Sequence, residues 1–512
     1  MPTLFTSLRA QHQTGAPRPI QTLPGTKVAP TTRAAADVSL LESERQFTLA
    51  AQPPPLRKRS RPKPKRKIAV IGAGLAGLCA AYELQGLGYE IVVYEARDRV
   101  GGRVESLSKF ATGKIAEGGG ELIGSNHPLW NSYRQHFGLH FSDVKEYKNS
   151  PYRFEGKTLS FERSQALVDE MTDQLRHLAD LAETVVDAFE PWSNRNARKL
   201  DSMVLTDWVS KARCSDICKD AINGMLAADN GIPANEQSLL GVLAMIKGGG
   251  LDRYWTDSEL YRCEGGNQQL AEKFREKLDR RRNSVFLQCP IKSIRKANNR
   301  VSLHTSEMRL LGEYDDVILA VPPSVWNRIR VVGFPELATK LSNPPAMGRN
   351  VKCLLKIKSR FWEVFASSPT LSEDGPVDLT WETTEQDPNA DFVMVAFSGS
   401  DDADTCSSWR SKSRRKRYVK ALQAPYPGVD KQILDLEFKD WPREEWTKAS
   451  YYFPRRGEVT LWGPFWKSGY GNWLHFAGEH TCYAFVGYME GALSSGYRLA
   501  RRLAIRDQIF LG

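Results

Sequence analysis

The sequence predicts an α/β protein whose folded body follows a basic tail, and three observations support this prediction. From residue 67 a short apolar strand, a glycine-rich turn and a helix-forming segment follow one another, and a second apolar strand comes next. The composition is ordinary for a globular protein, with 41% hydrophobic and 26% charged residues, which excludes a mainly disordered chain or a disulfide scaffold. Positive charge is concentrated before this unit. We therefore expect a folded body that begins near residue 67, preceded by a basic tail.

The first expected strand covers residues 67–71, a β-branched apolar run typical of a buried parallel strand. It leads into the pattern G-x-G-x-x-G, whose glycines are Gly72, Gly74 and Gly77. After the helix-forming segment, a second strand over residues 91–94 ends at Glu95, about 20 residues beyond the turn. This order of strand, glycine turn, helix, strand and acid predicts a Rossmann-like dinucleotide-binding unit.

Each residue of this pattern has a physical role. Gly72 permits the tight turn, Gly74 lets a diphosphate approach the main chain, and Gly77 lets the helix pack closely on the strands. The N-terminus of the helix offers free N–H groups and the positive end of the helix dipole to the phosphates. Glu95 can accept hydrogen bonds from ribose hydroxyls.

A second glycine turn separates this chain from a plain NAD dehydrogenase. Gly101, Gly102 and Arg103 follow soon after Glu95, where they can meet the diphosphate from another side. The extended pattern EARDRVGGRVES resembles the FAD-binding start of the flavin amine oxidase superfamily. The resemblance implies FAD as the cofactor, with Gly102 and Arg103 among the residues that bind it.

Further segments carry the same resemblance over most of residues 67–512. Residues 116–130 look like the family's glycine stretch beside the flavin, which places Gly119 and Gly120 there. Residues 351–362 look like the strand that bears the family's flavin-proximal lysine, which falls on Lys352. Residues 289–296 resemble a later strand of the FAD domain, with Ile291 near the adenine.

Residues 474–503 resemble the family's C-terminal flavin motif, an apolar strand, a turn and a final helix. The resemblance places Gly478 and Glu479 near the ribityl chain and diphosphate. It directs the main-chain N–H of Met489, at the start of the helix, toward the pyrimidine ring, where a helix N-terminus stabilises negative charge. Tyr488 becomes one wall of the family's aromatic cage.

The resemblance also implies two interleaved domains. We expect an FAD-binding domain of residues 67–150, 259–347 and 449–512, and a mixed-sheet substrate-binding domain of residues 151–258 and 348–448. Residues 1–66, rich in Pro, Thr, Ser, Ala and Gln, are expected to form a disordered basic tail. Residues 1–67 carry 13 Lys and Arg against three Asp and Glu, whereas the remaining residues carry 58 against 57.

The implied reaction is oxidation of a primary or secondary amine to an imine, with hydride transfer to flavin N5 and reoxidation by dioxygen to hydrogen peroxide. Lys352 is expected to hold a water near N5. Tyr488 is expected to orient the amine. Glu121, if it faces the site, would favour a cationic or polyamine substrate. The expected partners are a small-molecule amine or amino acid and dioxygen, and a homodimer is left open.

The sequence departs from the family's pattern at three places, which concern the flavin linkage, the aromatic cage and the binding of a substrate carboxylate. Monoamine oxidases carry a flavin-bonded cysteine before a YFPPG-like segment, and no cysteine precedes residues 451–457 here, so we expect non-covalent FAD. The second cage tyrosine falls on Ala449, so that wall is missing or comes from elsewhere, such as Trp462 or Trp466. Leu122 stands where venom-type L-amino acid oxidases carry a carboxylate-binding arginine.

Several alternatives remain open at this point. They are an L-amino acid oxidase, an FAD-dependent desaturase or protoporphyrinogen-type oxidase, and a chromatin or nucleic-acid-binding protein on an inactive flavin fold, which the tail suggests. No dedicated nucleic-acid module is visible. The eight cysteines are scattered without metal-ligand spacing, so no metal is expected and a reducing compartment is the default. No transmembrane run is present, so we expect an intracellular, most simply cytoplasmic protein, with organelle or nuclear targeting by the tail as alternatives.

Overall fold

A computed structural model describes residues 66–144, 152–279, 284–306, 309–365, 371–373, 375–383 and 391–509. The expected basic tail, residues 1–66, lies outside the described residues apart from Arg66. Within the described ranges, no helix combines the length and apolar character needed to cross a bilayer.

A five-stranded parallel sheet forms the centre of the nucleotide-binding part. Its strand order is β20-β13-β1-β2-β9, and every neighbouring pair is parallel. The strands are β1 (Lys67–Ile71), β2 (Glu90–Tyr94), β9 (Val285–Phe286), β13 (Asp316–Leu319) and β20 (Leu474–Phe476). The sheet thus brings together the two ends of the described chain, and the predicted α/β class is confirmed.

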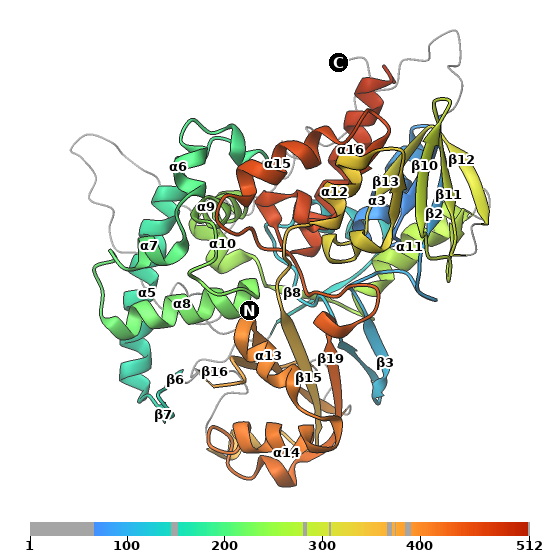
Figure 1. Ribbon diagram of the computed structural model, residues 1–512. Helices are drawn as coiled ribbons and strands as arrows, with labels where there is room; N and C mark the ends of the chain where they lie inside the picture. Colours follow the sequence, from blue (N-terminus) through green and yellow to red (C-terminus); the bar gives the residue numbers. More distant parts are fainter. Residues whose placement is uncertain are drawn as a thin grey trace, which may run out of the picture.

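Two helices pack tightly beside this sheet, α3 (Leu75–Gly86) and α16 (Met489–Arg506) (Figure 1). The first seven residues of α3 are all buried, as expected for a helix covered on one side by the sheet and on the other by α16. Gly496 permits the contact, because a Cβ there would overlap the main-chain carbonyl of Ala76. The first and last motifs of the sequence therefore share one core.

A seven-stranded mixed sheet forms the second part, with strand order β19-β15-β18-β17-β16-β6-β7. Its strands are β6 (Tyr152–Phe154), β7 (Lys157–Thr158), β15 (Asn350–Ile357), β16 (Leu371–Glu373), β17 (Leu379–Glu382), β18 (Phe392–Gly399) and β19 (Ile433–Asp440). Strand β15 lies between β18 and β19 and is buried along almost its whole length. The polar side chains of Asn350 and Lys352 are buried with it.

Helices gather to one side of this sheet, and two more pack beside it (Figure 1). The gathered helices are α5 (Phe161–Ala182), α6 (Ala197–Asp201), α7 (Leu205–Val209), α8 (Asp216–Asn230), α9 (Leu239–Gly248) and α10 (Asp252–Asp257). The other two are α13 (Ser400–Ser408), which contacts β15, β18 and α8, and α14 (Ser411–Leu422), at the lower end of the sheet in the figure. The end of α8 packs directly on β18, because a Cβ on Gly399 would overlap the main chain of Ala228.

Smaller elements complete the nucleotide-binding part. A four-stranded sheet has the order β12-β11-β10-β14, and two-stranded ribbons pair β3 with β4 and β5 with β8. These strands are β3 (Ser106–Ala111), β4 (Lys114–Glu117), β5 (Phe141–Asp143), β8 (Tyr261–Cys263), β10 (Ser293–Ala297), β11 (Arg300–His304), β12 (Leu310–Tyr314) and β14 (Arg330–Val332). The remaining α-helices are α4 (Pro128–Phe137), α11 (Gln268–Asp279), α12 (Pro335–Ser342) and α15 (Glu458–Ser468).

The two main sheets draw on different stretches of the chain. The parallel sheet uses residues 67–94, 285–319 and 474–476, and the mixed sheet uses residues 152–158 and 350–440. This separation supports the interleaved two-domain division that we infer from the sequence. The chain crosses between the two parts several times, so residues far apart in sequence meet where the parts adjoin.

Candidate active site

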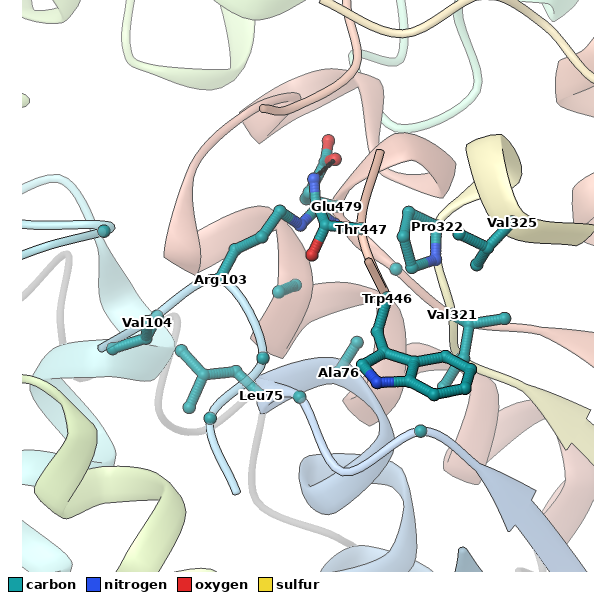
Figure 2. Close-up of a pocket in the computed structure, with 18 of the residues that line it drawn as sticks. Leu75, Ala76, Arg103, Val104, Val321, Pro322, Val325, Trp446, Thr447 and Glu479 are labelled. Atoms are coloured by element: carbon teal, nitrogen blue, oxygen red, sulfur yellow. Dashed lines mark hydrogen bonds and ion pairs between the residues drawn. The ribbon is translucent and has the colours of Figure 1, made fainter. Parts of the chain in front are cut away.

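A cavity of about 230 Å³ runs along the carboxyl ends of the parallel strands β1 and β13. Most of the residues that the sequence singles out line it (Figure 2). They are Gly72, Gly74, Glu95, Gly102, Arg103, Gly119, Gly120, Ile291, Lys352, Gly478, Glu479, Tyr488 and Met489. Gly77 and Glu121 do not line it. In open α/β sheets this edge is where ligands bind.

The glycine turn after β1 leaves the main chain open to a ligand. Gly72 has φ +108°, which favours glycine, and a Cβ on it would meet the Ala320 carbonyl oxygen at 2.9 Å. A Cβ on Gly77 would overlap the carbonyl of Gly72, so this residue lets α3 pack on its own turn. Gly74 has no neighbour within 4 Å of such an atom, and no side chain caps the helix that follows it. The turn therefore has room for a diphosphate at free helix N–H groups.

Glu95 at the end of β2 is buried and fixed by main-chain donors. Its Oε2 accepts a hydrogen bond from the Ala73 N–H at 2.8 Å, and its Oε1 accepts one from the Arg97 N–H at 2.9 Å. The carboxylate thus links the first glycine turn to the segment after β2. It stays at the cavity wall with accepting capacity left for ribose hydroxyls.

The second glycine turn joins the first and last motifs of the chain. The Gly101 N–H donates to the Ala73 carbonyl at 2.9 Å. Figure 2 shows Arg103 extending from this turn toward Glu479, and its Nη1 lies 2.6 Å from Glu479 Oε1. Glu479 also accepts hydrogen bonds from the N–H groups of Tyr452 and Gly487, both at 3.1 Å. Arg103 and Glu479 therefore link the second glycine turn to the C-terminal motif at the cavity wall.

Lys352 is on β15 and its side chain reaches the glycine stretch of the other part. It is only 6% exposed. Its Nζ donates to the carbonyls of Glu117 and Gly119 at 3.1 and 3.0 Å and to Glu121 Oε2 at 2.7 Å. Because an ammonium group has three protons, this arrangement uses each of them once. The predicted flavin-proximal lysine thus ties the mixed sheet to the glycine stretch.

Glu121 forms the centre of a buried charge cluster. Its Oε1 accepts hydrogen bonds from Arg262 Nε at 2.8 Å, from Trp381 Nε1 at 3.0 Å and from Thr383 Oγ1 at 2.8 Å. Burial by itself raises the pKa of the Glu121 carboxyl, but Lys352 and Arg262 outweigh it and lower the pKa to about 2. The expectation that Glu121 faces a cationic substrate does not fit this geometry, because the protein's own cations neutralise its charge.

The aromatic wall differs from the one that the sequence predicts. Tyr488, just before α16, lines the cavity, and its hydroxyl lies 3.3 Å from that of Tyr254. Ala449 is buried in the core and does not line the cavity, and neither do Trp462 or Trp466. Tyr451, which the sequence analysis missed, lines the cavity instead and lies against Gly487, next to Tyr488.

Other lining residues also escaped the sequence analysis. Phe397 on β18 and Trp441 lie near Lys352 on the cavity wall, and Trp446 and Thr447 line the nucleotide end. Arg97 donates to Thr447 Oγ1 at 2.6 Å. None of these residues belongs to a short motif, so spacing along the sequence carries no signal for them. Among the described residues, no cluster of three or more His, Cys, Asp or Glu side chains could hold a metal ion.

Comparisons with known proteins identify the class. The model of the family described as flavin containing amine oxidoreductase matches residues 75–504. The chain is 27% identical over 458 residues to a putative flavin-containing monoamine oxidase of Mycobacterium tuberculosis, covering 85% of this chain and 96% of that protein. It is 26% identical over 460 residues to the pig flavin-containing amine oxidase A, covering 85% and 84%.

Solved structures agree in fold. A putrescine oxidase bound to putrescine matches with a TM-score of 0.78 at 24% identity, covering 87% of this chain and all of the other. Cyclohexylamine oxidase from Brevibacterium oxydans matches with a TM-score of 0.77 at 23% identity over the same shares. The chain therefore belongs to the flavin-containing amine oxidoreductase family. It is an FAD-dependent amine oxidase, and the glycine turns, the free helix N-terminus and the shape of the cavity fit FAD.

Proposed function

We propose that the protein oxidises a primary or secondary amine to an imine in this cavity, using non-covalent FAD and dioxygen. The observation that carries the proposal is the convergence of Lys352, Tyr451 and Tyr488 on the cavity that the two glycine turns also line. Bound FAD supplies the acceptor for the hydride equivalent and reacts with dioxygen to give hydrogen peroxide. The imine then hydrolyses to an aldehyde or ketone.

The arrangement of cysteines supports non-covalent binding. Cys289 is the one cysteine among the residues that line the cavity, and it lies next to the Ile291 end, away from Lys352 and Tyr488. Lys448 and Ala449 occupy the region where the sequence comparison places the flavin-bonded cysteine of monoamine oxidases. No thiol therefore stands where such a bond would form.

Tyr451 and Tyr488 orient the substrate in this proposal. Burial raises the pKa of both phenols well above the usual value, so their hydroxyls stay neutral at any physiological pH. Two apolar rings with neutral hydroxyl groups hold an amine in its uncharged form and exclude water from it. An uncharged amine has the lone pair that supports hydride loss from its α-carbon.

Lys352 provides a fixed positive charge next to the aromatic wall. Glu121 and two main-chain carbonyls hold its ammonium in place. We assign to Lys352 the role of aiding oxygen reduction and of holding a water for proton transfer, which requires it to exchange one of its present acceptors for that water.

An amino acid substrate receives no specific support. The arginines that line the cavity are Arg97, Arg103 and Arg328. Arg97 is paired with Glu444, Arg103 with Glu479, and Arg328 donates to the Glu445 carbonyl and lies over Trp446. None of them is available at the Tyr488 end to hold a substrate carboxylate.

Anaerobic mixing with a panel of amines and amino acids tests the proposal. We expect amines to bleach the flavin absorbance and, in air, to yield one peroxide per turnover. Failure of every amine to bleach the purified yellow protein would refute the proposed function. Bleaching by amino acids alone would replace it with an amino acid oxidase.

A further inference from the structure

Helix α14 carries a dense positive charge at the lower end of the mixed sheet, away from the parallel sheet (Figure 1). Residues 405–429 contain seven Lys and Arg and no Asp or Glu. The seven cations are Arg410, Lys412, Arg414, Arg415, Lys416, Arg417 and Lys420. Residues 68–512 carry 58 basic against 57 acidic residues, and without these seven the balance would be 51 against 57. This one segment therefore turns a net negative charge into a net positive one.

The cations of α14 face outward. Tyr418 and Leu422 anchor the helix, because both are fully buried in the apolar cluster that contains side chains of β15 and β18. Six of the seven cations are exposed, namely Arg410, Lys412, Arg415, Lys416, Arg417 and Lys420. Lys412, Lys416 and Lys420 follow one another at intervals of four residues, so they form one line along the exposed side of the helix.

The described part of the chain does not neutralise this line of charge. None of the seven cations forms an ion pair with a described carboxylate. Arg414 and Arg415 donate instead to main-chain carbonyls, that of Trp409 at 2.9 Å and that of Leu434 at 3.3 Å. Like charges four residues apart destabilise a helix, and so does a cation in its first turn, where α14 has no acid. Charges kept at a cost to local stability indicate a functional contact with an external anion.

The chemistry of this surface favours one class of anion. It offers no exposed aromatic ring for stacking on bases, because Trp409 and Tyr418 are buried. Leu434, whose carbonyl accepts from Arg415, is 54% exposed and adds an apolar group beside the helix. Cations beside an exposed apolar side chain are typical of a contact with the headgroup region of an anionic bilayer.

We propose that α14 attaches the protein to the surface of an anionic lipid bilayer, with Lys412, Lys416 and Lys420 at the headgroups and Leu434 at the edge of the contact. None of these four residues lines the cavity, so the attachment is independent of the reaction. Because the attraction between exposed charges reaches only about 10 Å at 0.1 M salt, the attachment weakens as salt is added.

Sedimentation with vesicles tests the proposal on the full-length protein with its flavin bound. Vesicles of phosphatidylcholine alone are compared with vesicles that also contain phosphatidylserine, and flavin absorbance in the pellet measures binding. We expect binding to the anionic vesicles only, and release of the protein at about 1 M salt. Equal binding to both kinds of vesicle, or binding to neither, would overturn the proposal.

A triple variant locates the contact on α14. Lys412→Gln, Lys416→Gln and Lys420→Gln together should weaken binding to anionic vesicles about 100-fold, since each lysine near the surface contributes roughly a factor of five. The three side chains are exposed, so the variant should keep its flavin and its rate of flavin reduction. Tighter binding to duplex DNA than to the vesicles, lost in this variant, would overturn the proposal in favour of a nucleic acid.

A matched control removes the same charge from another exposed region. Arg195→Gln, Arg198→Gln and Lys199→Gln together alter the net charge equally at α6, and both triple variants keep the basic tail. The control should stay within about threefold of the wild type, as expected for charges that do not meet the bilayer. Equal affinities of the two triple variants for anionic vesicles would assign the attachment to the tail or to net charge and overturn the proposal.

Discussion

The two ends of the cavity are built in different ways. At the nucleotide end, main-chain groups of two glycine turns form the surface, and Arg103 pairs there with the buried carboxylate of Glu479. At the amine end, side chains from β15, from the segment before α15 and from the start of α16 meet. A site made of main chain tolerates no added atom, whereas a site made of side chains can change its specificity one residue at a time. This contrast predicts a different response to mutation at each end.

The largest effect on flavin content is expected at the nucleotide end, from Gly77→Ala. The added Cβ overlaps the carbonyl of Gly72, so the turn must shift or the helix must move away. We expect at least about tenfold less flavin per purified chain, because overpacking of this size costs roughly 1–3 kcal/mol. Absorbance spectra measure the flavin content. Gly86→Ala, at the open end of the same helix, is the control. A similar loss of flavin in this variant would show that the overlap at Gly77 is not the cause.

A large effect is also expected where the two parts meet, from Glu121→Gln. The change removes the anion between the buried cations of Lys352 and Arg262, so the free energy of unfolding should fall by about 3–5 kcal/mol. Urea unfolding followed by tryptophan fluorescence measures it. Asp173→Asn breaks an exposed pair with Arg176 and should leave the midpoint unchanged. An unchanged midpoint in Glu121→Gln would mean that the cluster does not join the two parts.

Tyr451 offers a smaller and more specific test of the amine end. Tyr451→Leu removes the ring and should lower kcat/KM for amines by about tenfold, in line with the value of an aromatic contact. Tyr451→Phe keeps the ring and should stay close to the wild type, with some loss of stability because the hydroxyl no longer donates to the Asp229 carbonyl. Stopped-flow flavin reduction separates the two variants. Equal losses in both would assign the effect to the hydroxyl rather than to the ring.

The glycine turns of the nucleotide end could be predicted from the sequence, whereas Trp446 and Thr447 beside them could not. The glycines of the two turns occur at short spacing, so Gly72, Gly74 and Gly102 were identifiable together with the helix that follows the first turn. Strand β1 has the bounds that the apolar run indicates, and α16 begins at Met489, within two residues of the predicted start. Local patterns carry this information because the contacts themselves are largely local.

The amine end could not be predicted from the sequence, because its contacts join residues that are far apart along the chain. Glu121 is paired with Arg262 and Lys352, 141 and 231 positions away, and no spacing rule relates them. Alignment of a short segment placed the second tyrosine of the family's aromatic cage on Ala449. Main-chain hydrogen bonds between Gly348 and residues 450 and 451 instead direct Tyr451 toward the cavity. Only the fold shows which of several adjacent aromatic residues faces inward.

The position of β20 and α16 has a consequence for biosynthesis. Residues 474–506 supply the outer strand of the parallel sheet, the acid that pairs with Arg103 and the helix that covers α3. The glycine turn at residue 72 leaves the ribosome about 400 residues earlier, before these partners have been translated. A chain that ends before β20 therefore exposes the first glycine turn without the acid and the helix that complete the nucleotide site. Such a chain should not retain FAD.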